Sequence, residues 1–156
     1  MDAVAPQSRD MRGSETSQQY HWSAGWDIYH MTCQASRVIL AEIVPRLPAR
    51  ERHAWVHQLS RASQAIPQLL AEGYAKRSER CDFQKYFEDA MAETYETVVS
   101  LYHCRYLYAA YVDTTLYGRL IDTYDELGRQ LFLLCEAQAA STTSDERCDQ
   151  TSSWAT

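Results

Sequence analysis

The sequence has few glycines, and none of them stands in a pattern that holds a phosphate or a catalytic serine. Its five glycines are scattered over 156 residues and form no Gly-x-Gly-x-x-Gly string, no Walker loop and no Gly-x-Ser-x-Gly turn. No pattern pairs a nucleophile with a base, and the Glu-x-x-His motif of di-iron bundles does not occur. We therefore expect a protein that is not an enzyme and uses no cofactor.

Paired cysteines and long apolar runs are also missing. The five cysteines are odd in number and include no Cys-x-x-Cys pair, so neither a disulfide framework nor a zinc ribbon is predicted. Residues 1–19 hold no signal-peptide core. The longest apolar run near the end, Leu131–Cys135, is far below the roughly 20 residues of a membrane span. We expect reduced thiols, no membrane contact and a cytoplasmic location.

Basic residues are outnumbered, because 15 Lys and Arg face 21 Asp and Glu for a formal net charge of −6. This balance argues against a surface that neutralises phosphates throughout. The charge is uneven, however. Residues 49–80 carry six basic and three acidic residues, whereas residues 81–140 carry four and ten. A local basic patch for nucleic acid is compatible with this distribution, and so is a solvated face or a contact between subunits.

Apolar residues make up 46% of the chain and recur at helical spacing in four segments, while no segment shows sustained period-two alternation. The first two predicted helices run from about 23 to 46 and from 49 to 75; the third begins after Ser78 or Asp82 and ends near 108, and the fourth begins after Asp113, Thr114 or Thr115, with each helix about 24 to 28 residues long. Short connections between them favour an all-α, up-down-up-down four-helix bundle. The polar ends, 1–22 and 141–156, are expected to be flexible tails around one domain at 23–140.

Each predicted helix has one apolar stripe that we expect to face the core. The stripes are Trp26, Tyr29, Cys33, Leu40, Ile43 and Leu47; Trp55, Leu59, Ala62, Ile66 and Leu69 or Leu70; Phe83, Phe87, Ala90, Thr94, Val98 and Leu101; and Leu116, Leu120, Tyr124, Leu127, Leu131 and Leu134.

Prolines and capping residues refine the predicted helix ends. Pro45 should tighten or bend the last turn of the first helix, and Pro67 should kink the second, because proline lacks the donor for the helical hydrogen bond. Ser78 or Asp82 is the candidate cap of the third helix. For the fourth helix the candidates are Asp113, Thr114 and Thr115.

Histidine offers one candidate metal pair. His53 and His57 are four residues apart, a spacing that places two imidazoles on one helix face. Ala54 stands where zinc proteases of this pattern carry glutamate. The alternative is that both histidines are polar residues near the start of a helix.

Tyrosine is abundant, with eleven in the chain. Five of them crowd the junction of the third and fourth helices, and such side chains stack on nucleobases or fill subunit interfaces, where a ring with a polar tip suits half-buried positions. We favour an interface. The five are Tyr102, Tyr106, Tyr108, Tyr111 and Tyr117.

The segment 58–77 resembles the second-helix signature of the 23S rRNA-intervening-sequence family, also called the four helix bundle protein family. Arg61-Ala62, Ile66-Pro67 and Ala71-Glu72-Gly73 carry the resemblance. Residues 26–47, Glu96 and Leu127-Gly128-Arg129 are similar to further family positions, so the likeness extends over about 23–138. The sequence differs from the family's usual pattern at Ala65, Leu69 and Ala92-Glu93.

The resemblance implies an up-down bundle that assembles as a homopentamer. It also implies a link to RNA, since some relatives are encoded inside rRNA intervening sequences. Others are accessory proteins of diversity-generating retroelements that bind nucleic acid and a reverse transcriptase. DNA, RNA and a reverse transcriptase are therefore expected partners by resemblance, beside further copies of the chain.

Helical geometry suggests which residues meet a partner. Arg61 and Glu72 are eleven residues apart, about three turns, and so lie on nearly the same face. Our hypothesis is that this face and the basic turn after it contact another subunit or a partner; the alternative is a rim of the helix without function. The residues in question are Gln58, Arg61, Glu72, Lys76, Arg77 and Arg80.

The function expected from the sequence is a non-enzymatic, homo-oligomeric interaction protein, associated with nucleic acid or a ribonucleoprotein. The alternative is a helical bundle that binds a small ligand, or a metal through His53 and His57.

Overall fold

The computed structural model describes residues 12–48, 55–76 and 80–140. Within these ranges the chain forms four α-helices and no strand: α1 (Arg12–Val38), α2 (His57–Ala75), α3 (Arg80–Leu107) and α4 (Thr114–Ala140). The predicted all-α four-helix fold is confirmed. Residues 1–11, 49–54, 77–79 and 141–156 lie outside the described residues, and with them most of the predicted tails.

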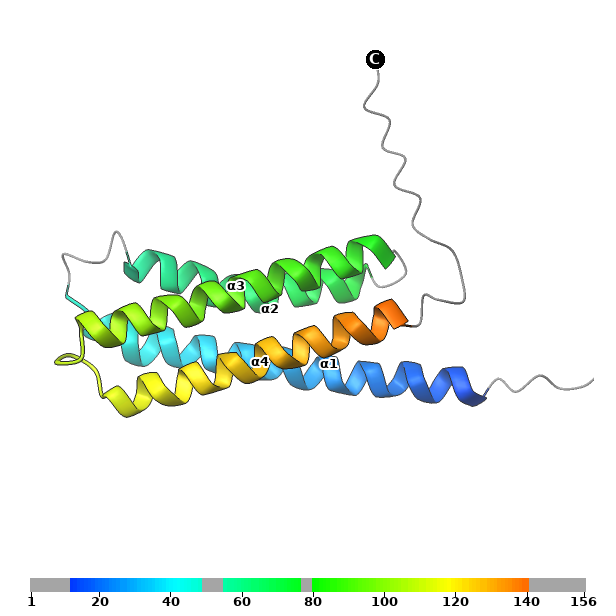
Figure 1. Cartoon of the computed structure of the whole chain (residues 1–156), viewed down its shortest axis with the longest axis horizontal. Helices are drawn as coiled ribbons and strands as arrows, with labels where there is room; N and C mark the ends of the chain where they lie inside the picture. The colour runs from blue at the N-terminus through cyan, green and yellow to red at the C-terminus, as the bar shows by residue number, and fades with distance from the viewer. Residues whose placement is uncertain (1–11, 49–54, 77–79, 141–156) are drawn as a thin grey trace, which may run out of the picture.

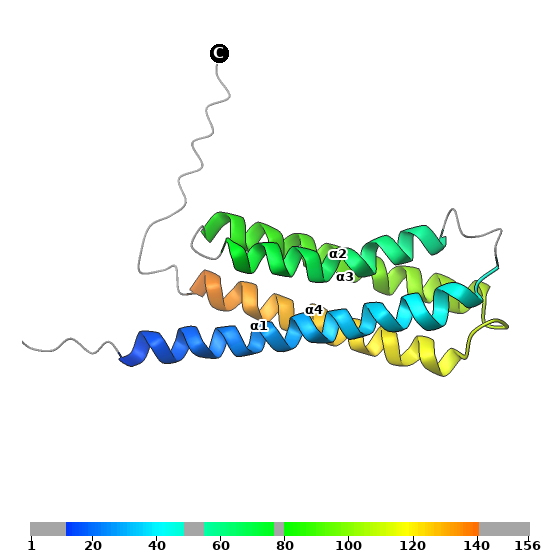
Figure 2. The same cartoon turned by 180° about the vertical axis from the view of Figure 1, so that it is seen from behind.

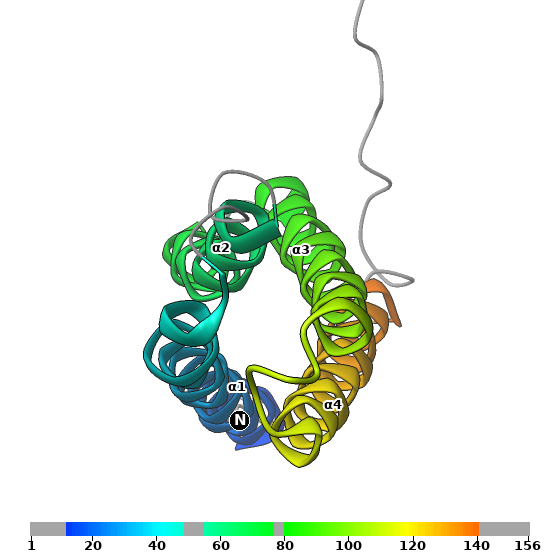
Figure 3. The same cartoon turned by 90° about the vertical axis from the view of Figure 1, so that its left-hand side faces the viewer.

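The helices surround a common axis in chain order, so that α4 returns to the side of α1 (Figure 3). Consecutive helices run in opposite directions (Figure 1). Ion pairs between α2 and α3 agree with this arrangement, since Arg61 reaches Glu96 while Lys76 reaches Asp82. The two helices are therefore antiparallel, as a short connection between them requires.

The first helix begins earlier than its apolar pattern suggested. We predicted a start near Ser23, but α1 begins at Arg12, so the predicted boundary between tail and domain at 22/23 falls inside a helix. These first turns extend beyond the end of α4 (Figure 2). Adding residues to an existing helix costs little compared with nucleating one, which is why a polar segment without a core stripe can continue α1.

The far end of the first helix changes its winding around Pro45. After Val38 the chain forms a π-helical turn, η1 (Ile39–Ile43), and then a 3-10 turn, η2 (Val44–Arg46). The backbone N–H of Val44 bonds to the carbonyl of Ile39, one residue further back than in an α-helix. Because Pro45 has no N–H to donate, this wide turn followed by a tight one ends the helix. The predicted tightening at Pro45 is confirmed.

The core stripe of α3 is confirmed, and so are those of α2 and α4 apart from the half-buried Trp55 and Leu134. In the first helix Ile43 and Leu47 are buried as predicted, but the earlier residues of the stripe were placed one strip too far round the helix. Trp26 is 55% exposed, and Tyr29, Cys33 and Leu40 are half-buried beside α2. Two stripes with helical spacing run along this helix, and large aromatic residues marked the wrong one. The residues of the helix and its last turns that are buried are Ile28, Thr32, Ala35, Ser36, Ile39, Ile43 and Leu47.

Two further predictions concern residues near helix ends or interruptions. The carboxylate of Asp113 accepts a hydrogen bond from the backbone N–H of Thr115 at 2.9 Å, which makes it the cap of α4. Asp82 lies in the first turn of α3, which begins at Arg80, and its carboxylate pairs with Lys76; Ser78, the other candidate cap, lies outside the described residues. Helix α2 continues through Pro67.

Candidate interaction surfaces

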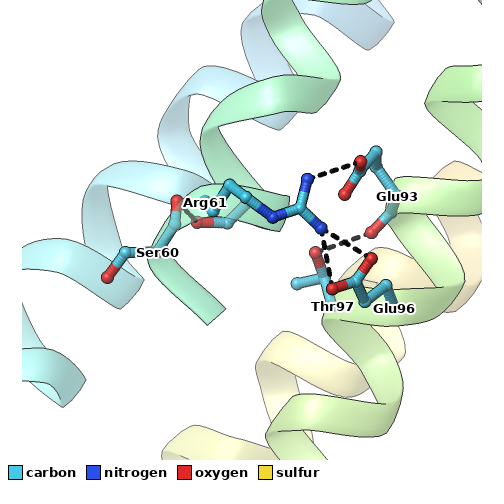
Figure 4. A network of polar contacts seen from close by, with 6 residues as sticks. Ser60, Arg61, Glu93, Glu96 and Thr97 are labelled. Carbon is cyan, nitrogen blue, oxygen red and sulfur yellow. Dashed lines mark hydrogen bonds and ion pairs between the residues drawn. The ribbon is translucent and has the colours of Figure 1, made fainter. Parts of the chain in front are cut away.

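Arg61 links α2 to α3 through two carboxylates. Its Nη1 donates to Oε1 of Glu93 at 2.8 Å, and its Nη2 donates to both oxygens of Glu96 at 2.8 Å. Figure 4 shows the guanidinium extending from α2 between these two side chains. The carboxylates are three residues apart and so lie on one face of α3. The planar guanidinium has several N–H donors and can donate hydrogen bonds to both carboxylates.

The environment of this cluster is partly shielded from water. The side chain of Arg61 is 48% exposed, whereas that of Glu93 is 20% exposed, and Oε2 of Glu93 is buried without a hydrogen-bond partner among the described residues. Hydrogen bonds to Glu93 and then Glu96 raise the pKa of the arginine. The guanidinium therefore balances two like charges that would otherwise repel each other beside the bundle core.

The structure thus gives Arg61 an intrachain partner that the sequence hypothesis did not name. Lys76 is similarly engaged, since its Nζ lies 2.7 Å from Oδ2 of Asp82 and 5.6 Å from the ring centre of Tyr86. Two basic side chains of the predicted partner-binding face are therefore directed to acidic residues of α3. Both remain nearly half exposed.

The other residues predicted for this face are less constrained. Gln58 is half-buried and Glu72 is exposed on α2. Arg77 lies outside the described residues, and Arg80 is the first residue of α3. The structure therefore brings Arg61 and Lys76 to the α2–α3 border.

A cluster of aromatic rings accounts for the Gly73-Tyr74 part of the signature. A methyl group on Gly73 would lie 3.0 Å from the Phe87 ring and 3.1 Å from Cβ of Tyr86, so glycine allows α2 to approach α3 closely. The Tyr74 ring makes edge contacts with Phe83 and Phe87, at centroid distances of 5.9 and 5.3 Å. Its burial raises the pKa of Tyr74 to about 12.

The same tyrosine also requires a glycine on α1. A methyl group on Gly25 would lie 1.4 Å from the Tyr74 oxygen and 2.0 Å from Cζ, distances at which atoms overlap. The ring therefore rests on the bare backbone of α1. The two glycines and Tyr74 join three helices at one end of the bundle, and this role is structural packing rather than chemistry.

The candidate metal pair is not assembled in the part of the chain that the structure describes. His57 is exposed on the first turn of α2, and His53 lies outside the described residues. No group of three or more His, Cys, Asp or Glu side chains suited to a metal occurs among the described residues.

The buried titratable groups are poorly suited to nucleophilic chemistry. Burial raises the pKa of the Cys104 thiol to about 11, so the reactive thiolate is scarce at neutral pH. Burial also raises the pKa of Cys135 and of Tyr124. These groups therefore contribute to packing in their neutral forms.

Open grooves run along the outside of the bundle. One of ≈590 Å³ lies between α1 and α2 and is lined by Tyr29, Cys33 and Pro67, among others. A second of ≈490 Å³ lies between α3 and α4, where Gly128 has no side chain to fill the space between Tyr95 and Phe132. Such shallow grooves suit contact with another helix better than enclosure of a small ligand.

Of the five tyrosines predicted to fill an interface, Tyr102, Tyr106 and Tyr111 are exposed, whereas Tyr108 and Tyr117 are buried in the core. The sequence reasoning missed the other exposed apolar side chains of α3 and α4, which include Tyr95, Val99, Phe132 and Leu133. The signal was present in the helical spacing of Tyr95, Val99, Tyr102 and Tyr106, which follow one another at steps of four, three and four. The large apolar residues that are at least two-fifths exposed are Trp26, Tyr95, Val99, Tyr102, Tyr106, Leu107, Tyr111, Phe132 and Leu133.

Comparisons with known proteins give one match. The model of a family described as 23S rRNA-intervening sequence protein matches residues 26–132, a range that includes the Arg61 cluster, both signature glycines of α2 and α4, and the exposed row on α3. No curated protein and no solved structure matches the chain. Among the described residues, every helix is too short or too polar to span a bilayer.

Proposed function

Because the chain belongs to the 23S rRNA-intervening sequence protein family, we propose that it is a non-enzymatic interaction protein that acts as a homo-oligomer, with five copies as the expected number. The number five comes from the family resemblance. The oligomer is supported independently by the surface of the bundle.

The observation that carries the proposal is the exposed apolar row on α3 and α4. Tyr95 is 59% exposed and Phe132 is 52% exposed, and both line the same groove. Large contiguous apolar surfaces are uncommon on monomers and mark sites of protein contact. Tyrosine and phenylalanine are also enriched where subunits meet.

The chemistry of the described residues supports a role without catalysis. Cys104 is buried with a raised pKa, and the described grooves are open rather than enclosing. Cys33, Cys104 and Cys135 are free thiols, which persist in a reducing compartment. The proposal therefore includes a cytoplasmic location.

Sedimentation velocity and light scattering of the full chain test the oligomer. The expected mass is about five times 18.0 kDa, stable on dilution into the low micromolar range, where contacts of standard size hold. A single species at 18.0 kDa across this range would refute the proposal.

We propose secondly that the end of the bundle where α2 begins and α3 ends contacts nucleic acid or a ribonucleoprotein. Tyr106 is 81% exposed there, and the rings of Trp55 and His103 lie 4.5 Å apart. Arg105 is exposed on the same turn of α3. Exposed rings beside a basic side chain suit a single strand, because bases stack on the rings while the cation contacts phosphate.

Binding of a fluorescent stem-loop RNA, titrated at several salt concentrations, tests this second proposal. We expect affinity to fall as salt rises, and Arg105→Gln to lower the salt slope by about 1. Lys85→Gln, which removes an exposed base near the opposite end of α3, is the matched control and should leave the slope unchanged. Absence of binding at low salt, or equal slopes for both variants, would contradict the proposal.

A further inference from the structure

Two exposed apolar features lie on different helix pairs of the bundle. The groove between α3 and α4 is lined by Tyr95, Gly128, Phe132 and Leu133. Trp26 projects from α1, and its ring stacks on Tyr29, which lines the groove between α1 and α2. The end-on view places the α1–α2 pair and the α3–α4 pair on opposite sides of the bundle axis (Figure 3).

The indole of Trp26 is both exposed and held in place. It is 55% exposed, yet it stacks on Tyr29 with ring centroids 5.6 Å apart and packs edge-on against His30 at 4.8 Å. A side chain that is already ordered loses little rotamer entropy when it binds. Tryptophan is also among the residues that contribute most to binding at interfaces.

The groove offers the surface that such an indole requires. Its floor is Gly128, and its walls are the apolar side chains of Tyr95, Phe132 and Leu133. Arg129, another lining residue, provides a cation for the face of an aromatic ring. Val99 is exposed one turn further along α3. The exposed surface of Val99 and the three wall residues amounts to roughly 400 Å², which is about the apolar part of one side of a standard interface.

The two features also lie on the same side, along the bundle axis, of the groove between α1 and α4. The border of α1 and α4 brings Met31 to the same groove as Thr123. Trp26 precedes Met31 by five residues and Gly128 follows Thr123 by five, so on antiparallel helices both are displaced by about 7.5 Å in the same direction. A copy related by rotation about an axis parallel to the bundle keeps that displacement, so its Trp26 would approach the groove.

We propose that Trp26 of one copy inserts into the α3–α4 groove of the next, forming a head-to-tail contact that closes into a ring. The occupant of the groove is a second copy of this chain, because the chain carries both halves of the contact, on different helix pairs and displaced toward the same end of the bundle. Contacts between two different surfaces generate rings or filaments rather than two-fold dimers. This inference rests on the proposed homo-oligomer and specifies its interface.

Two variants, each blocking one half, test the contact. Trp26→Glu removes the indole, and Gly128→Gln fills the groove. The second variant is expected to fold, because an added Cβ meets only Thr94 Cγ2 at 3.8 Å and the helix gains propensity when glycine is replaced. Each variant alone should weaken self-association at least about 30-fold, the effect of losing a strong interface residue. Tyr111→Glu, an exposed aromatic in the connection between α3 and α4, is the matched control.

Mixing the two variants gives the decisive result. Trp26→Glu retains an intact groove and Gly128→Gln retains an intact indole, so an equimolar mixture should form a one-to-one heterodimer and nothing larger. A mixture that stays monomeric would overturn the inference, and a wild-type chain that stops at a dimer would show a two-fold contact in place of a ring. Circular dichroism of each variant verifies folding.

The wild-type chain separates this inference from the proposed function. If the wild type is oligomeric and Gly128→Gln or Trp26→Glu leaves its mass unchanged, the head-to-tail contact is wrong and the homo-oligomer stands. A monomeric wild type refutes the proposed function itself, and the interface with it.

Discussion

Replacing Gly25 by alanine should destabilise the bundle although alanine is the better helix former. The new methyl group would lie 1.4 Å from the Tyr74 oxygen, so the ring must leave its place against α1. In doing so it loosens its edge contacts with Phe83 and Phe87, at 5.9 and 5.3 Å.

The size of the effect follows from two opposing contributions. Forcing a methyl group into a packed position typically costs about 1–3 kcal/mol, and each lost aromatic pair adds about 0.5–1.5 kcal/mol. Alanine over glycine within a helix returns about 1 kcal/mol. With both aromatic pairs counted, we therefore expect a net loss of about 1–5 kcal/mol in the free energy of unfolding.

A chain that carries Tyr74→Ala provides a second test, because there the effect of Gly25→Ala on the free energy of unfolding should change sign. In a Tyr74→Ala chain the three atoms nearest to a Cβ on Gly25 are removed, so Gly25→Ala should stabilise by up to about 1 kcal/mol. Gly118→Ala is the matched control, since nothing lies within 4 Å of a Cβ added there, and it should stabilise in both backgrounds. Urea unfolding at one protein concentration, followed by circular dichroism, measures all of these changes. If Gly25→Ala is stabilising in the wild-type background too, the contact between Tyr74 and α1 is refuted.

Three further substitutions test other parts of the structure. Arg61→Gln should lower the free energy of unfolding by about 1–2 kcal/mol, because the largely buried Glu93 loses its partner. Adding Glu93→Gln should recover part of this loss in the same urea assay, and additive losses would contradict the pairing. Tyr117→Phe should be neutral or stabilise by up to about 1 kcal/mol, since the buried hydroxyl has no hydrogen-bond partner among the described residues; a clear loss would mean that the hydroxyl is satisfied. Asp113→Ala should lower the melting temperature at neutral pH by removing the cap of α4. The Thr115 N–H lowers the pKa of Asp113 in the folded state, so this stabilisation is complete above the unfolded value of 3.8 and lost as pH falls through the lower folded value. The difference in melting temperature between variant and wild type should therefore be largest at neutral pH and shrink as the pH falls below 3.8.

The periodic pattern predicted the core where one stripe was clearly more apolar than its neighbours. In α3 all six stripe residues, from Phe83 to Leu101, are buried. In α1 two stripes compete, and the smaller residues Thr32 and Ala35 take the core position while Trp26 is exposed. Spacing within one helix cannot separate these cases, because the choice depends on the space that neighbouring helices leave.

Ion pairs between side chains on different helices could not be predicted from the sequence for a related reason. The spacing of Arg61 and Glu72 correctly assigned them to similar positions around the helix, yet the partners of Arg61 are Glu93 and Glu96, more than thirty residues away. Only the register of α2 against α3 reveals this pairing. Asp113 could be listed among three cap candidates because capping is local, whereas its choice over Thr114 and Thr115 required the helix boundary itself.

The crowded junction of Gly25, Gly73 and Tyr74 bears on how relatives of this chain can be found and how they differ. The residues of the segment Ala71–Tyr74 are restricted by how closely three helices approach one another. Such a segment is therefore typical of one architecture and does not specify what that architecture binds. Outward-facing positions such as Tyr95 and Phe132 are free of that restriction. Chains that share the segment can therefore exchange one partner for another by changing their surfaces, while the bundle itself stays the same.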